Sequence, residues 1–255
     1  MARSGRQTEL PLARPSAAKA GWGGKRARAG RKPVGARAGA PHRRRPTLAA
    51  RHPVHVVIRV VEDVRGLRTR HAYAAIRRAM IGQVRRADFR ICHLSIQRTH
   101  VHLLVEADDA TALARGMQGF QISAAKQLNA ELSRRRGRRR RGTVFPDRYH
   151  AEILTSPTRV RHALAYVVNN WRKHREDRAS TNAVRWRVDP FSTAVALTPW
   201  RETDLPFRWP RGYQPMPASR PRTWLLSCGW RRAGDVSMFE RPASGPRDRA
   251  RGSTH

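Results

Sequence analysis

Hydrophobic residues follow two different periods along the middle of the chain. The segment PVHVVIRVVE, which begins at Pro53, is rich in β-branched residues and predicts a strand. In HAYAAIRRAMIGQVRR the apolar residues recur at helical spacing, at Tyr73, Ile76, Met80 and Val84. Two strand-like runs follow, DFRICHLSIQ (88–97) and HVHLLVEA (100–107), and only two residues separate them. This arrangement predicts an antiparallel hairpin.

Two more helices and a fourth strand complete the pattern. After Asp109, a plausible N-cap, apolar residues mark one face of a long helix: Leu113, Met117, Phe120, Ala124, Leu128 and Leu132. Residues 142–156 predict a strand, and residues 156–177 predict a helix with Pro157 in its first turn. The order predicts a ferredoxin-like α+β fold, in which a four-stranded antiparallel sheet carries two helices on one face. The first and third strands are then neighbours in the middle of the sheet, and the third helix lies elsewhere.

The two ends of the chain differ from this middle part. Residues 1–52 contain fourteen Lys or Arg and one acidic residue, Glu9, without any apolar period. That composition predicts a disordered basic arm. Residues 179–255 hold five of the seven tryptophans among many prolines, and they predict an irregular extension with a small packed element at TWLLSCGWRR. We therefore expect three parts: the arm, a domain at 53–178 and the extension.

The charge of the chain narrows the choice of partners. The chain has 53 Lys and Arg against 18 Asp and Glu, a formal net charge of +35, which favours a polyanion as the partner. No apolar run approaches the roughly 20 residues that span a bilayer, so we expect no membrane segment. The cysteines, Cys92 and Cys228, lie far apart and suggest neither a disulfide framework nor a zinc site. A reducing, cytoplasmic setting is the expectation.

The densest charge is the run RRRGRRRR at 134–141, with seven arginines in eight residues. Such a run cannot pack against itself, so it predicts a solvated loop or a clamp for phosphates. The candidate nucleic-acid contacts are these arginines, one arginine of the following segment and one lysine of the last helix: Arg134, Arg135, Arg136, Arg138, Arg139, Arg140, Arg141, Arg148 and Lys173.

Two histidines share one face of a predicted strand. Because side chains alternate along a strand, His100 and His102 point to one side and Val101 points to the other. Two imidazoles that converge in this way can supply two nitrogen ligands to a divalent metal. The same spacing is common among half-exposed histidines on a sheet that binds nucleic acid, so the spacing alone leaves both interpretations open.

A tyrosine on the last predicted helix lies away from the apolar stripe of that helix. At about 100° per residue, Tyr166 lies roughly 140° from the centre of the stripe, and Asn170 and Lys173 follow on the same polar flank. A phenol beside an amide and an ammonium group can attack a phosphate, and a tyrosine at a helix boundary can also serve packing alone. Tyr149 is the rival nucleophile, but it lies on a predicted strand, where aromatic residues are ordinary packing.

The order of these motifs resembles one known family. The strand THVHLLVEA, the Met117-Gln118 pair in the next helix, the segment GTVF and the final Tyr-x-x-x-Asn helix are similar to the REP-associated tyrosine transposases and to the single-tyrosine HUH transposases of insertion sequences. The resemblance covers residues 53–178. Two departures are visible: Arg98-Thr99 replaces Pro-Asn before the first histidine, and Pro-Val is missing after the asparagine pair. Neither departure removes a group that the chemistry needs.

The resemblance implies a transposase-like enzyme that cleaves and rejoins single-stranded or hairpin DNA through a 5′-phosphotyrosine. Tyr166 would be the nucleophile, and His100 and His102, with Asn170 as a third ligand, would hold Mg²⁺ or Mn²⁺. The arginine run and Lys173 would contact DNA. The resemblance further implies a location at the bacterial nucleoid and allows a homodimer.

A second class of function is compatible with the same pattern. A ferredoxin-like sheet in basic surroundings is also the plan of RNA-recognition modules, so a non-catalytic nucleic-acid-binding protein, or a domesticated transposase, is the alternative. RNA-recognition sheets need exposed aromatic residues that stack on bases. The predicted sheet offers His100, His102 and few aromatic residues, which favours the enzyme.

Overall fold

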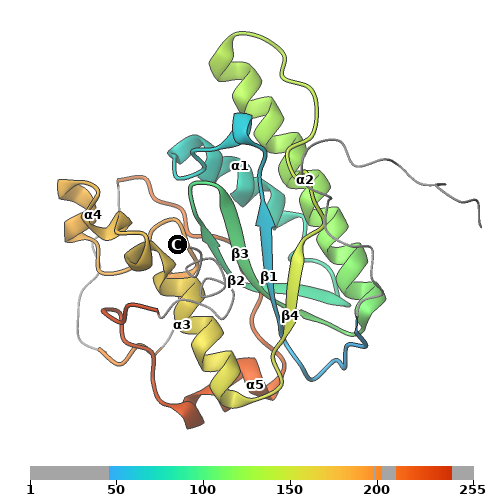
Figure 1. The fold of residues 1–255 in the computed structure, drawn as a ribbon, viewed down its shortest axis with the longest axis vertical. Coiled ribbons are helices and arrows are strands. Elements are labelled where there is room, and N and C mark those ends of the chain that lie inside the picture. The colour runs from blue at the N-terminus through green and yellow to red at the C-terminus, as the bar shows by residue number, and fades with distance from the viewer. Residues whose placement is uncertain (1–45, 198, 203–210, 243–255) are drawn as a thin grey trace, which may run out of the picture. The chain divides into compact units, whose positions relative to one another are not determined.

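A four-stranded antiparallel sheet forms the centre of the molecule (Figure 1). The computed structural model describes residues 46–197, 199–202 and 211–242. The strands are β1 (Val54–Arg59), β2 (Phe89–Ile96), β3 (His100–Ala107) and β4 (His150–Ile153), in the spatial order β2-β3-β1-β4. The predicted fold class and the central position of the first and third strands are confirmed.

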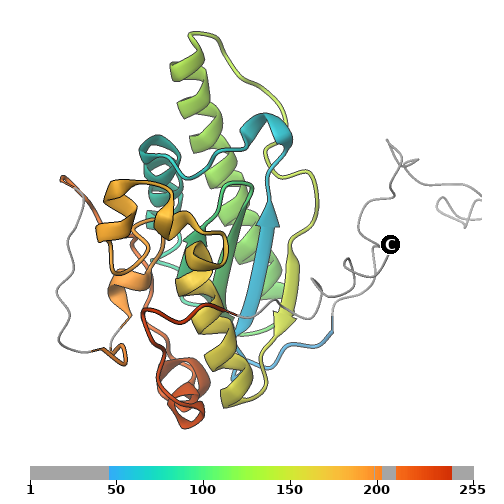
Figure 2. The same cartoon turned by 60° about the vertical axis from the view of Figure 1, so that its left-hand side comes forward.

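Three long helices lie on the two faces of this sheet. The helices α1 (Arg70–Ile81) and α2 (Ala110–Arg136) cover one face, and α3 (Pro157–Lys173) covers the other, as the turned view shows (Figure 2). Three N-cap side chains behave as the sequence predicts for such helices. Thr69, Asp109 and Ser156 each accept a hydrogen bond from a backbone N–H of the first turn.

The two faces of the sheet have separate hydrophobic cores. Between the sheet and α1 and α2, the strands contribute only apolar side chains, for example Val56, Leu94 and Leu103. In the hydrophobic core between the sheet and α3, the strands contribute only two buried residues, Cys92 and Leu104. The rest of that second core comes from Leu154, from α3 and from residues between 188 and 238.

Three predicted boundaries are wrong. The first helix ends at Ile81, and Val84 lies beyond it and is half exposed. The fourth strand is only four residues long, because residues 142–149 leave the sheet and run beside α2. The arginine run is not wholly a loop: its first three arginines form the last turn of α2, which ends at Gly137 with φ of 64°.

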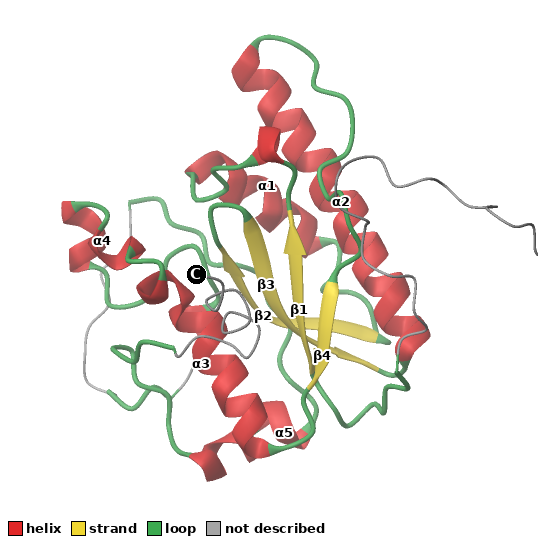
Figure 3. Ribbon diagram, in the orientation of Figure 1, coloured by secondary structure: helices red, strands yellow, loops and turns green. Residues whose placement is uncertain are grey.

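Residues 179–242 are more than an irregular appendage. They contain the short helices α4 (Thr181–Arg185) and α5 (Trp224–Ser227), the second at the predicted TWLLSCGWRR element, joined by loops (Figure 3). The fully buried carboxylate of Glu106 in β3 accepts hydrogen bonds from the backbone N–H groups of Arg222 and Thr223 and from the Thr223 hydroxyl. Arg68 donates two hydrogen bonds to the buried Asp189. These contacts fasten the segment to the sheet.

Two remaining expectations concern the ends and the membrane. The predicted basic arm, 1–52, falls outside the described residues except for 46–52, where Leu48 packs into the first core. Among the residues that the structure describes, no helix has the length and apolar composition needed to cross a bilayer.

Candidate functional site

The two histidines of β3 lie on the face of the sheet that α3 covers. The imidazole ring centres of His100 and His102 are 4.6 Å apart. The register of β3 against β1 pairs His102 with Val57 and Leu104 with His55, so a third imidazole lies diagonally beside His102. Nε2 of His55 is 3.2 Å from Nδ1 of His102, and the two rings are stacked.

Tyr166 of α3 lies directly against this histidine cluster. Its ring meets the ring of His102 edge-on with 5.1 Å between centres, and the ring of His55 at 5.9 Å. The ammonium group of Lys173, two turns further along α3, donates to the Tyr166 hydroxyl at 3.4 Å and lies 5.0 Å from the ring centre. Tyr166 and Lys173 are both half-buried. The fold therefore brings the candidate nucleophile, one cation and the two candidate histidine ligands together.

His102 is held in its neutral form. Burial lowers its pKa well below the usual value, and the neighbouring His55, His100, His174 and Lys173 lower it further. A neutral imidazole is the form that binds a metal. Its Nδ1 faces His55, whereas its Nε2 is buried and has no hydrogen-bond partner in the described structure. If the proton of neutral His102 is on Nδ1, Nε2 has a lone pair available for a ligand.

Asn170, one turn after Tyr166, differs from its expected position on a polar flank. It is fully buried, because residues after 179 cover the part of α3 that the sequence pattern leaves open. Both its Oδ1 and its Nδ2 lack a hydrogen-bond partner among the described residues. A buried, unsatisfied amide costs about 1–3 kcal/mol, so the position is explained only if something else binds it.

The donor set fits a divalent cation. Imidazole nitrogen and amide oxygen both suit Mn²⁺, and the oxygen suits Mg²⁺. The described residues contain no group of three or more His, Cys, Asp or Glu side chains arranged for a metal, so the amide of Asn170 would have to complete the set. The unpartnered atoms of His102 and Asn170 are the ones such an ion would need.

Two histidines of the site were not predicted from the sequence. The alternation in PVHVVIRV places His55 on the face opposite the apolar residues of β1, which is a usable signal that the sequence reasoning missed. His174 follows the C-terminus of α3, and its ring centre is 6.0 Å from that of His100. No period links His174 to the strand, so only the fold reveals this neighbour.

The structure divides the predicted DNA-contacting arginines into two groups. Arg134 pairs with Glu131, and Arg136 and Arg140 both bind Asp63. Those two guanidinium groups lower the pKa of Asp63 to about 2. The others are exposed and have no ion pair within the described part of the chain: Arg135, Arg138, Arg139, Arg141 and Arg148. Only this second group is available to phosphates without breaking an internal contact.

The rival nucleophile lies elsewhere. Tyr149 is partly buried against the first core, on the side of the sheet that α1 and α2 cover, and it lines a cavity beside α2. The histidine pair lies on the other side. The α3 face also differs from an RNA-recognition surface, because α3 covers the sheet where such a module would leave it open.

Comparison with known proteins gives one family match. Residues 49–170 match the family model described as "Transposase IS200 like". No curated protein matches the chain significantly. Among solved structures, the chain is similar to a REP-associated tyrosine transposase bound to a REP hairpin, with 17% identity, a TM-score of 0.47, and coverage of 72% of this chain and 99% of that one. It is also similar to a bacterial tRNA(His) guanylyltransferase-like protein in complex with GTP, with 16% identity, a TM-score of 0.35, and coverage of 64% and 73%.

Proposed function

We propose that residues 49–170, which match the IS200-like transposase family model, cut and rejoin single-stranded or hairpin DNA through a covalent bond to Tyr166. The observation that carries this proposal is the contact between Tyr166 and His102, with 5.1 Å between ring centres, beside a buried His102 nitrogen that has no partner. This contact places the candidate nucleophile directly beside a candidate metal ligand.

His100, His102 and Asn170 are the residues that would hold Mg²⁺ or Mn²⁺. Such an ion, when bound, polarises a non-bridging oxygen of the scissile phosphate. The role of His55 is to position His102: with its proton on Nδ1, the imidazole of His102 donates to Nε2 of His55, and its Nε2 then faces the ligand site. In this tautomer Nε2 of the neutral imidazole carries no proton.

Tyr166 supplies the reacting atom. As the phenol gives up its proton, its oxygen forms a bond to phosphorus while the bond from phosphorus to the 3′ oxygen breaks. The released 3′ oxygen takes up a proton, which leaves a 5′-phosphotyrosine and a 3′-hydroxyl. Lys173, 3.4 Å from the phenol oxygen, places a positive charge beside the charge that moves during the step. The phosphotyrosine bond conserves the energy of the phosphodiester, so a second 3′-hydroxyl can reverse the step.

The exposed arginines, with Arg148, would bind the DNA backbone outside this site. Phosphate contacts of this kind are salt-dependent and carry little sequence information. Action on genomic DNA implies a place at the nucleoid.

The test is to trap the covalent adduct. End-labelled single-stranded and hairpin oligonucleotides are incubated with the full chain and Mn²⁺, and a band that survives denaturation is sought. We expect the adduct to form with the native chain, to disappear with Tyr166→Phe while DNA binding stays within about threefold, and to persist with Tyr149→Phe. DNA binding without any adduct would support a non-catalytic binding protein. An adduct that requires Tyr149 would move the nucleophile to the other face.

A further inference from the structure

The part of the α3 face that lies over β1 and β4 is less covered than the rest. Among the described residues, the core beneath α3 takes its strand residues from β2 and β3. Both ribbon views show β1 and β4 beside this helix (Figure 1, Figure 2). The side chains that β1 and β4 direct to this face are half-buried or exposed: His55, Val57, Arg59, His150 and Glu152. A DNA strand can therefore approach Tyr166 over these two strands.

Arg59, the last residue of β1, lies directly beside the first candidate metal ligand. The register of β1 against β3 pairs Arg59 with His100. One step further, the backbone N–H of Val60 donates to the carbonyl of Thr99 at 3.0 Å, so these two residues form a hydrogen-bonded pair. Because the two kinds of pair alternate along an antiparallel ladder, Arg59 and His100 form a non-hydrogen-bonded pair, the kind whose side chains lie closest together. Both side chains leave the sheet on the α3 face.

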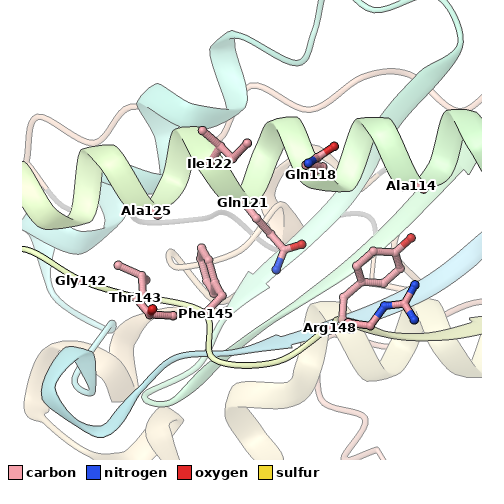
Figure 4. A pocket seen from close by; sticks show the side chains of 11 residues that line it. Ala114, Gln118, Gln121, Ile122, Ala125, Gly142, Thr143, Phe145 and Arg148 are labelled. Atoms are coloured by element: carbon pink, nitrogen blue, oxygen red, sulfur yellow. The ribbon is translucent and has the colours of Figure 1, made fainter. Parts of the chain in front are cut away.

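The fourth strand does not extend far enough to cover Arg59. Its pairing with β1 stops at Val57 and His150. The residues before His150 turn to the opposite side of the sheet, where Phe145 packs against the first core and points toward α2 (Figure 4). Arg59 therefore borders the open end of this ladder, which explains why it is exposed.

The positive charge of Arg59 is not used inside the described part of the chain. Its guanidinium makes no hydrogen bond or ion pair with any residue that the structure describes. The carboxylate that β4 contributes to this face, Glu152, pairs instead with Arg159 at 3.2 Å. An exposed cation beside the histidine cluster thus remains available to an anion from outside.

We propose that Arg59 binds the phosphate next to the scissile one and thereby aligns the DNA strand over the site. A planar guanidinium can hold a phosphate through two parallel N–H donors, which fixes direction as well as distance. Tyr166 contacts His102, with 5.1 Å between ring centres, whereas Arg59 pairs with His100, the other histidine of the strand. This separation suits two neighbouring phosphates of one strand. The inference rests on the proposed function for the identity of the scissile phosphate.

The role of Arg59 differs from that of Lys173. The ammonium group of Lys173 lies 3.4 Å from the phenol oxygen, beside the reacting atoms, so its loss should slow the chemical step. A contact to the adjoining phosphate is the same before and during the reaction. The loss of Arg59 should therefore weaken DNA binding and leave the rate of adduct formation at saturating DNA within about threefold of the native rate.

The experiment removes one charge from the protein and one from the DNA. In the oligonucleotide that gives the Tyr166 adduct, single methylphosphonates, in which a methyl group replaces one charged phosphate oxygen, are placed in turn on either side of the cleaved linkage. Affinity for the full chain is measured by fluorescence anisotropy without a divalent metal. We expect one adjoining position to weaken binding by the native chain about fivefold. Arg59→Gln should weaken binding of the unmodified strand by a similar factor and lose its sensitivity to that one position, because both changes remove the same contact.

Two further variants separate a phosphate contact from other effects of the substitution. Arg85→Gln is the matched control: Arg85 is exposed and has no ion pair within the described residues, but it follows α1 on the other side of the sheet, so every methylphosphonate effect should persist. Arg59→Lys keeps the charge without the planar fork and should stay sensitive at the same position. Urea denaturation should give Arg59→Gln the stability of the native chain, since its guanidinium has no internal partner.

Two results would overturn the inference. One is an unchanged methylphosphonate pattern in Arg59→Gln, and the other is a rate of adduct formation at saturating DNA that falls more than threefold, which would place Arg59 on the scissile phosphate itself. An unchanged pattern with a native adduct leaves the proposed function standing without this contact. If no oligonucleotide gives an adduct, the scan is made along the one that binds most tightly. A position whose effect disappears in Arg59→Gln then supports the contact, although the proposed function has failed.

Discussion

The two faces of one sheet carry opposite kinds of side chain. Toward α1 and α2 the strands present apolar residues alone, among them Val54, Ile58, Phe89 and Val105. Toward α3 the same strands present mostly polar ones: His55, Arg59, His93, Ser95, His100, His102 and Glu106. Because strand residues alternate, both sets come from the same few segments of sequence.

The difference shows how stability and chemistry are divided in this fold. On the α1 and α2 face the strands contribute apolar side chains, as expected for a core that stabilises the fold, and the buried carboxylate there, Glu131, belongs to α2. On the α3 face, His102 and Asn170 are buried with unpaired polar atoms, which costs free energy. Unsatisfied buried groups are expected at functional sites and rare elsewhere. Substitutions should therefore have opposite consequences on the two faces.

The largest effect on folding should come from Gly116 in α2. A Cβ at this position would lie 2.1 Å from the ring of Phe89, in a helix that cannot move away from the sheet. We expect Gly116→Ala to lower the free energy of unfolding by about 3 kcal/mol, measured by urea denaturation, with adduct formation per folded molecule unchanged. Gly119→Ala is the control. Its Cβ would meet only the Gln83 amide at 3.8 Å, so helix propensity should make it neutral or stabilising by up to about 1 kcal/mol. A well-folded Gly116→Ala protein would show that this face tolerates repacking.

The α3 face should make stability depend on pH through His93. Burial lowers the pKa of His93 from 6.5 to about 4, with Glu106 opposing the change. Between these two values the unfolded chain binds a proton that the folded chain does not, so stability falls as pH falls from 6.5 to 4. The full difference corresponds to about 3 kcal/mol.

The measurement is the free energy of unfolding at pH 7 and at pH 4.5 for the native chain and for His93→Leu. The acid loss should be smaller in His93→Leu. An identical acid loss in the native chain and in His93→Leu would mean that His93 is protonated in the folded state.

The next effect distinguishes two adjacent asparagines. Asn169 and Asn170 are both buried in α3, but the amide of Asn169 donates to the carbonyl of Ser237 at 2.9 Å, whereas the side-chain amide of Asn170 has no hydrogen-bond partner among the residues that the structure describes. We expect Asn170→Leu to raise the free energy of unfolding by about 1 kcal/mol and to weaken Mn²⁺ binding at least tenfold, measured by EPR. Asn169→Leu should instead lower stability by about 1–2 kcal/mol and leave Mn²⁺ binding unchanged. Destabilisation by Asn170→Leu without loss of Mn²⁺ would mean that the amide is structural.

Local periodicity was sufficient to predict most of the fold. The strand pattern, the helical spacing and the caps at Asp109 and Ser156 identified every strand and long helix, because each depends on neighbouring residues. The errors occurred where a distant contact decides the outcome. Asn170 is buried because residues after 179 return to cover α3, and no local period contains that information.

The residues of the candidate site could likewise be predicted where a local pattern decides their position, and not where a distant contact does. The direction of His100 and His102 follows from alternation along one strand, and Tyr166 follows from one helix. Their proximity depends on how α3 crosses the sheet, which only the family resemblance suggested beforehand. His174 and the cavity beside α2 depend on pairs of segments far apart in sequence, so sequence reasoning did not find them.

The smallest effect extends the comparison to the arginine run, where ion-paired arginines alternate with exposed arginines that we propose to contact DNA. Arg136 and Arg140 are held by Asp63, whose pKa of about 2 keeps it ionised from neutral pH down to strong acid, so this contact is lost only as pH falls through about 2. Arg138 and Arg139 have no such partner among the residues described.

Replacing both Arg138 and Arg139 by Gln should reduce the slope of log affinity for DNA against log salt concentration by about two, because each phosphate contact releases roughly one counterion. The matched pair Arg136→Gln with Arg140→Gln removes the same charge and should change the slope less, since those guanidinium groups already face a carboxylate. Equal slopes for the two double variants would show that DNA displaces Asp63 and recruits the whole run.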